Sequence, residues 1–145
     1  MSRPATILCI DDEVKGLAVR KMLIESHGYE VVTATSGREG LALFVSHPIR
    51  AVVLDYAMPE MNGAEVAAAL KRINPAVKIL LYSAYPDLPE EVSRWVDAYA
   101  IKGDHPKTLI AAVQQLLACP EAPSQVDSCR RPVGLSPEIV SGNPD

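Results

Sequence analysis

The chain has 145 residues, which suits one domain with a single hydrophobic core and leaves no room for a second folded module. Its 14 lysines and arginines nearly balance its 18 aspartates and glutamates, so it lacks the broad positive field that direct nucleic-acid binding requires. An uninterrupted run of only four apolar residues precedes the first acids, too short for a signal peptide or a membrane span. We therefore expect a cytoplasmic protein with no membrane partner.

Short apolar runs rich in valine and isoleucine alternate with segments of helical period, the pattern of repeated βαβ units. This pattern predicts an α/β fold, a flavodoxin-like doubly wound parallel sheet of five βα units with strand order 2-1-3-4-5. Ligands of such sheets bind at the carboxyl ends of the strands, near the point where the strand order reverses. The predicted strands lie near 6–10, 30–34, 51–54, 78–82 and 98–101.

The helices between these strands have recognisable start signals. Ser36 with Glu39, and Asn62 with Glu65, fit capping boxes, in which two side chains bond each other's backbone N–H groups. The helix that follows Asn62, near 63–73, and another helix near 106–118 each show one apolar stripe and are expected to cover one face of the sheet. The stripe predicted for the first of them consists of Val66, Ala69, Leu70 and Ile73.

From residue 119 onward the composition changes. Residues 119–145 contain five prolines, no aromatic residue and no apolar periodicity. Such a segment cannot bury enough apolar surface to offset the entropy cost of ordering. We therefore predict a folded domain over residues 5–118 and a proline-rich, disordered carboxyl-terminal tail.

Polar residues follow four of the apolar runs: Asp11 with Asp12, Asp55, Ser83 and Lys102. Because the carboxyl ends of parallel strands meet at one edge of a sheet, we expect these side chains to face each other. Three carboxylates there would repel by roughly 3 kcal/mol per pair, taking about 5 Å and an effective dielectric constant near 20. Either a raised pKa on one acid or a divalent cation would offset this repulsion, and Mg²⁺ suits carboxylate ligands.

With a cation present, Asp55 could act as a carboxylate nucleophile toward phosphorus, and Ser83 and Lys102 could bind the phosphoryl oxygens. The motifs DDE at 11–13, LDYAMPEMNG at 54–63, YSA at 82–84 and YAIKG at 99–103 resemble the receiver domain of bacterial two-component response regulators, in its single-domain form.

The resemblance implies a phosphorylation switch rather than a turnover enzyme, since it catalyses only its own phosphorylation and dephosphorylation. It implies that Asp55 accepts a phosphoryl group from a sensor histidine kinase or a histidine phosphotransfer protein. Asp12, Asp55 and the backbone carbonyl of Ala57 would hold Mg²⁺, with Asp11 acting through water. Ser83 and Lys102 would be the phosphoryl-binding residues.

The same resemblance implies a switch in which Ser83 moves toward the phosphate and Tyr99 swings inward. This movement would remodel a face built from the fourth helix, the fifth strand and the fifth helix, roughly residues 87–117. That face would bind a downstream protein target. Whether phosphorylation also produces a homodimer stays open.

Two residues depart from the family pattern. Gly103 follows Lys102 where the family usually has a proline joined by a cis bond, and a cis bond before glycine costs roughly 2.5–4 kcal/mol. We therefore expect a trans bond or a looser loop at Lys102. Asn62 replaces a frequent aspartate but keeps a helix cap.

Two other functions stay open on the sequence alone. The Gly103 departure lends weight to a receiver-like adaptor that works without phosphorylation. An aspartate-nucleophile, Mg²⁺-dependent phosphatase of the haloacid-dehalogenase type is weaker, because the adjacent acids do not match its first-strand motif and no cap domain is evident.

Overall fold

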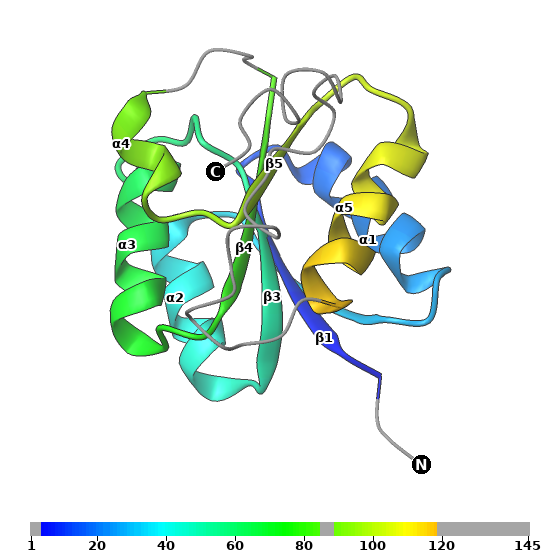
Figure 1. Cartoon of the computed structure of the whole chain (residues 1–145), viewed down its shortest axis with the longest axis horizontal. Helices are drawn as coiled ribbons and strands as arrows, with labels where there is room; N and C mark the ends of the chain where they lie inside the picture. Colours follow the sequence, from blue (N-terminus) through cyan, green and yellow to red (C-terminus); the bar gives the residue numbers. More distant parts are fainter. Residues whose placement is uncertain (1–3, 85–88, 119–145) are drawn as a thin grey trace, which may run out of the picture.

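A computed structural model describes residues 4–84 and 89–118 of the chain (Figure 1). Its five strands form one parallel sheet in the order β2-β1-β3-β4-β5, which confirms the predicted fold class and topology. The strands are β1 (Thr6–Ile10), β2 (Glu30–Ala34), β3 (Ile49–Leu54), β4 (Lys78–Ser83) and β5 (Ala98–Ile101). The helices are α1 (Val14–Glu25), α2 (Gly37–Ser46), α3 (Gly63–Ile73), α4 (Glu90–Ser93) and α5 (Pro106–Ala118).

Some predictions fall outside the described residues. These are the predicted tail over residues 119–145 and the first part of the predicted partner face, residues 87 and 88. Within residues 4–84 and 89–118, no helix has the length and apolar character needed to cross a membrane.

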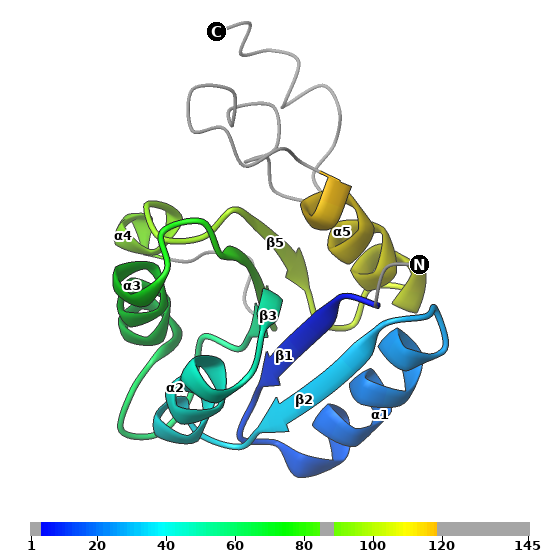
Figure 2. The same ribbon diagram turned by 90° about the horizontal axis from the view of Figure 1, so that it is seen from below.

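Helices cover both faces of the sheet (Figure 2), with α1 and α5 on one face and α2, α3 and α4 on the other. Alternate residues of β1 point to opposite faces: Leu8 and Ile10 join the core under α2 and α3, whereas Ile7 and Cys9 join the core under α1 and α5. All four are completely buried. A strand covered on both sides must be apolar throughout, which explains the uninterrupted apolar runs in the sequence.

Strand register brings the predicted site residues to one edge. The Asp55 backbone N–H donates to the carbonyl of Ile10 over 3.0 Å, so the residues that follow β1 and β3 lie next to each other. The Lys102 backbone N–H donates to the carbonyl of Ser83 over 2.8 Å, so the residue that follows β5 lies next to the last residue of β4. The parallel ladder thus assembles residues that are far apart in the sequence.

One of the two predicted capping boxes is complete. Asn62 Oδ1 accepts from the Glu65 N–H over 3.0 Å, and Glu65 Oε1 accepts from the Asn62 N–H over 2.9 Å. The Ser36 box is only half formed: Ser36 Oγ accepts from the Glu39 N–H, but the Glu39 carboxylate bonds Thr35 instead. Thr35 offers that carboxylate both a backbone N–H and a hydroxyl, two donors in place of one.

The predicted stripe on α3 is wrong at its last member. Ile73 is 48% exposed, whereas Ala64 and Ala67 are buried. The buried residues of α3 are Gly63, Ala64, Val66, Ala67 and Leu70, so its buried face ends one turn before Ile73, and its first turn lies close to the residues that follow β3. A Cβ atom at Gly63 would lie 2.8 Å from the carbonyl oxygen of Asp55, so only glycine fits. This close approach seats α3 directly beside the candidate site.

Candidate functional site

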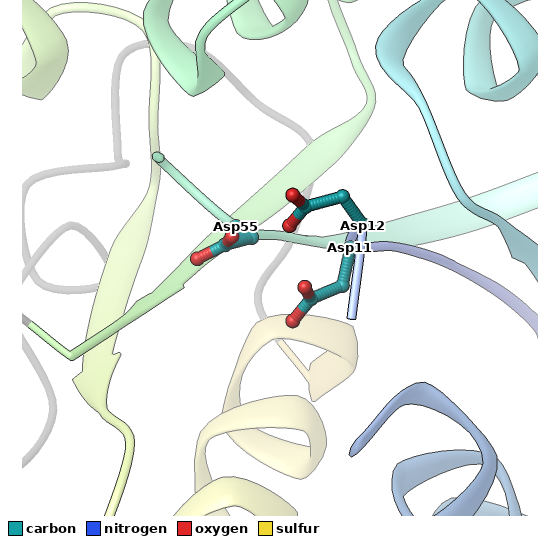
Figure 3. A group of neighbouring side chains, drawn as sticks. All are labelled: Asp11, Asp12 and Asp55. Atoms are coloured by element: carbon teal, nitrogen blue, oxygen red, sulfur yellow. The ribbon is translucent and has the colours of Figure 1, made fainter. Parts of the chain in front are cut away.

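Three carboxylates meet at the carboxyl edge of the sheet (Figure 3). Asp11 and Asp12 follow β1, Asp55 follows β3, and one oxygen of each lies within 4.8 Å of the others. Asp11 and Asp55 are buried, whereas Asp12 is exposed at the rim. The convergence expected from the sequence is therefore present, and its donor set of carboxylate oxygens suits a hard divalent cation.

Lys102 links two of these acids. Its Nζ lies 2.6 Å from Asp11 Oδ2 and 3.2 Å from Asp55 Oδ1. Burial acts to lower the pKa of Lys102, but the hydrogen bond to Asp11 and the charges of both acids outweigh it and raise the pKa. The lysine is therefore a permanent cation of the acid cluster.

Asp11 and Asp55 respond differently to the same surroundings. Burial, followed by the charge of Asp11, raises the pKa of Asp55, and Lys102 only partly opposes this. Burial also acts to raise the pKa of Asp11, but hydrogen bonds from Lys102 and from the Glu13 N–H, together with nearby positive charge, lower it overall. Within the cluster, the negative charge of Asp55 is thus less well compensated by neighbouring groups than that of Asp11.

A family model described as the response regulator receiver domain matches residues 7–116. The chain belongs to this family. Among curated proteins, the receiver domain is similar to the transcriptional regulatory protein GlrR of Escherichia coli (strain K12), with 32% identity over 91 residues. That match covers 63% of this chain and 20% of GlrR, so the chain spans only a fifth of that relative's length.

Among solved structures, the receiver domain resembles the response regulator protein TrrA from Thermotoga maritima, determined in complex with Mg(2+)-BeF. The identity is 34%, the TM-score is 0.72, and the match covers 78% of this chain and 99% of TrrA. A second structure shows TrrA in complex with the histidine kinase ThkA. There the identity is 33%, the TM-score is 0.73, and 79% of this chain and 99% of that chain are covered.

At Gly103, the residue that departs from the family pattern, the loop forms a turn with a trans peptide bond. No peptide bond among the described residues is cis, so the Lys102–Gly103 bond is trans. Gly103 has a φ of +97°, and the Asp104 N–H donates to the Ile101 carbonyl over 3.3 Å. Positive φ at the third position is what a type II turn requires, which explains the glycine. Lys102 nevertheless reaches both acids.

The remaining predicted residues lie around this cluster. Ser83 is the last residue of β4, rather than the first one after it, and is 2% exposed. Ala57 is exposed in the loop that follows Asp55. Tyr99, in β5, is half-buried against the core under α3 and α4, and burial raises its pKa. These positions leave their predicted roles untested.

Sequence reasoning missed one residue of the site. Arg20 of α1 is buried, and its Nη1 lies 3.2 Å from Asp11 Oδ2. The signal was a charged residue on an otherwise apolar helix face, because Leu17, Arg20 and Ile24 are the buried positions of α1. A buried arginine requires an anion, and the carboxyl edge of the neighbouring strand supplies one.

Proposed function

We propose that Asp55 is the phosphoacceptor of this receiver domain. It would take a phosphoryl group from the phosphohistidine of a sensor histidine kinase or a histidine phosphotransfer protein, with Mg²⁺ bound at the acid cluster. The observation that carries this proposal is the meeting of three carboxylates within 4.8 Å, with Lys102 bridging Asp11 and Asp55. The complexes of TrrA with Mg(2+)-BeF and with a histidine kinase support it by similarity.

In the reaction, a carboxylate oxygen of Asp55 attacks phosphorus while the phosphorus–nitrogen bond of the phosphohistidine breaks. The bonding electrons remain on the imidazole nitrogen, and an acyl phosphate forms on Asp55. Lys102, already 3.2 Å from Asp55, would neutralise a phosphoryl oxygen, and the Ser83 hydroxyl would bind another. Bound Mg²⁺ would supply positive charge to the phosphoryl oxygens.

The metal ligands in this proposal are Asp12, Asp55 and the backbone carbonyl of Ala57. Asp11 would act through water because both of its oxygens already have protein partners. Its Oδ1 accepts from the Glu13 N–H over 2.9 Å, and its Oδ2 contacts Lys102 and Arg20. Mg²⁺ commonly keeps several waters and binds through few carboxylates, which fits this division.

The proposed output surface is the face formed by α4, β5 and α5. It would bind a downstream protein target, or a second copy of the chain. β5 is an edge strand of the sheet, and Tyr99 on it is only half-buried. A tyrosine in that position can change its packing without disturbing the fully buried core. Movement of Ser83 and Lys102 toward a phosphoryl group would reach β5 directly, since Lys102 follows its last residue.

Neither alternative function gains support. The adaptor hypothesis relied on Gly103, yet Lys102 contacts both acids despite this glycine. The phosphatase hypothesis requires a different family from the one to which the chain belongs.

The test is phosphorylation by acetyl phosphate in the presence of Mg²⁺, followed by intact mass spectrometry. The parent protein should gain one phosphate, and Asp55→Asn should gain none. Asp104→Asn removes an exposed carboxylate close to Lys102 and should be labelled like the parent, which controls for the loss of one acid. Labelling that persists in Asp55→Asn would show that another residue accepts the phosphate.

A further inference from the structure

Asp11 is paired with two cations rather than one. Lys102 Nζ lies 2.6 Å and Arg20 Nη1 lies 3.2 Å from the same oxygen, Asp11 Oδ2. Asp11 is 1% exposed and Arg20 is 7% exposed, so water screens this pair little. The Arg20 contact is therefore a buried ion pair of the site and not a surface salt bridge.

The surroundings of Arg20 hold its long side chain in place. Its guanidinium carbon lies 4.8 Å from the centre of the Tyr82 ring, a distance at which a cation is attracted to an aromatic face. Gly16, one helical turn earlier, lies next to this side chain, since a Cβ atom there would be at the ordinary van der Waals distance of 3.6 Å from Arg20 Nη2. Arg20 thus runs back along α1 toward Asp11, as long helical side chains do.

We infer that Arg20 is a fixed counter-ion of Asp11 that weakens Mg²⁺ binding at the acid cluster. This inference rests on the Mg²⁺ site of the proposed function. Three carboxylates and Lys102 alone would carry a net charge of −2, and Arg20 reduces this to −1. A unit charge about 7 Å from a divalent ion changes its affinity roughly sevenfold even at the dielectric constant of bulk water.

The test is isothermal titration of the unphosphorylated, full-length protein with MgCl₂ at constant ionic strength. Arg20→Gln and Arg20→Met, which both remove the charge, should bind Mg²⁺ at least about fivefold more tightly than the parent. Arg20→Lys retains the charge and should bind within about twofold of the parent. Lys21→Met makes the same change in net charge on the exposed side of α1 and should leave the affinity unchanged. Circular dichroism spectra establish that each variant is folded.

Several outcomes would overturn the inference. One is that the parent binds Mg²⁺ and the variants without the Arg20 charge bind it no more tightly. Another is an Arg20→Lys variant that behaves like Arg20→Met, because this would show that Arg20 acts through packing alone. A parent and variants that all fail to bind Mg²⁺ would overturn it together with the proposed metal site. Phosphorylation of Asp55 is judged separately, by the mass experiment on Asp55→Asn.

Discussion

Two groups of buried charges lie at opposite ends of the sheet, and they differ in how completely they are paired. At the amino ends of β4 and β5, Lys71 Nζ lies 3.0 Å from Asp97 Oδ2. The same Asp97 oxygen accepts from the Ile79 N–H over 2.8 Å, and Lys71 also donates to the Val77 carbonyl over 2.6 Å. One acid meets one base, and each has a further backbone partner.

At the carboxyl edge, three acids meet only two cations. Arg20 and Lys102 both contact Asp11, and Lys102 alone also contacts Asp55. The excess of acids affects Asp55, whose pKa is raised by burial and by the charge of Asp11. The Lys71–Asp97 pair is neutral by itself. The acid cluster has excess negative charge, which the Mg²⁺ of the proposed function would offset.

The largest effect is expected from breaking the neutral pair. Lys71→Met leaves Asp97, which is 7% exposed, without its cation and should lower the free energy of unfolding by roughly 2–4 kcal/mol. Urea denaturation with and without Mg²⁺ measures this loss, and Mg²⁺ should not restore it. Lys21→Met removes a half-exposed partner of Glu25 and should cost less than about 1 kcal/mol. If Lys71→Met and Lys21→Met lowered the free energy of unfolding equally, the buried pair would be no more important for stability than the exposed one.

A smaller effect is expected from a double-mutant cycle at the carboxyl edge. Arg20→Met and Lys102→Met each leave Asp11 with one cation, whereas the double variant leaves it with none. Without divalent ions, the double variant should therefore lose roughly 1–3 kcal/mol more than the sum of the single losses. Lys21→Met combined with Lys102→Met should be additive within about 0.5 kcal/mol. Additivity in both cycles would show that Arg20 and Lys102 do not share Asp11.

The smallest effect should have the opposite sign. The folded-state pKa of Asp55 is raised, so its ionised form destabilises the folded protein above that pKa. In the absence of divalent ions at pH 7, Asp55→Asn should raise the free energy of unfolding by roughly 0.5–2 kcal/mol. The difference from the parent should shrink as the pH falls through the folded pKa of Asp55, because the parent becomes protonated. Denaturation curves between pH 7 and pH 4 test this, and a pH-independent difference would refute it.

Asp11 should stabilise the folded protein when it is ionised, and this stabilisation should change with pH over a lower range. Its pKa is lowered in the folded state, so its stabilisation is complete above the ordinary value of 3.8 and is lost as the pH falls through the folded pKa. Asp55→Asn leaves this contribution in place. As the pH falls, protonation of Asp55 should therefore remove its destabilising effect at a higher pH than that at which protonation of Asp11 removes its stabilising effect.

Much of the fold was predictable because its causes are local. Apolar runs such as the one over β1 indicate strands buried on both faces, and turn and cap residues such as Asn62 mark where helices begin. The half-formed box at Ser36 and the exposed Ile73 were not predictable. The first depends on a neighbouring donor at Thr35, and the second on which residues of α3 pack against the rest of the fold.

For the site, the residues that follow the strands could be identified from the order of apolar runs along the chain: Asp11, Asp12, Asp55 and Lys102. Parallel topology then brings strand ends together, so their convergence could be inferred from chain order. Which of these charges form ion pairs depends on the folded arrangement of the side chains. Ion pairs depend on distances of about 3 Å between atoms from different elements, such as the 3.2 Å between Arg20 Nη1 on α1 and Asp11 Oδ2 after β1. No periodic pattern in the sequence records such distances.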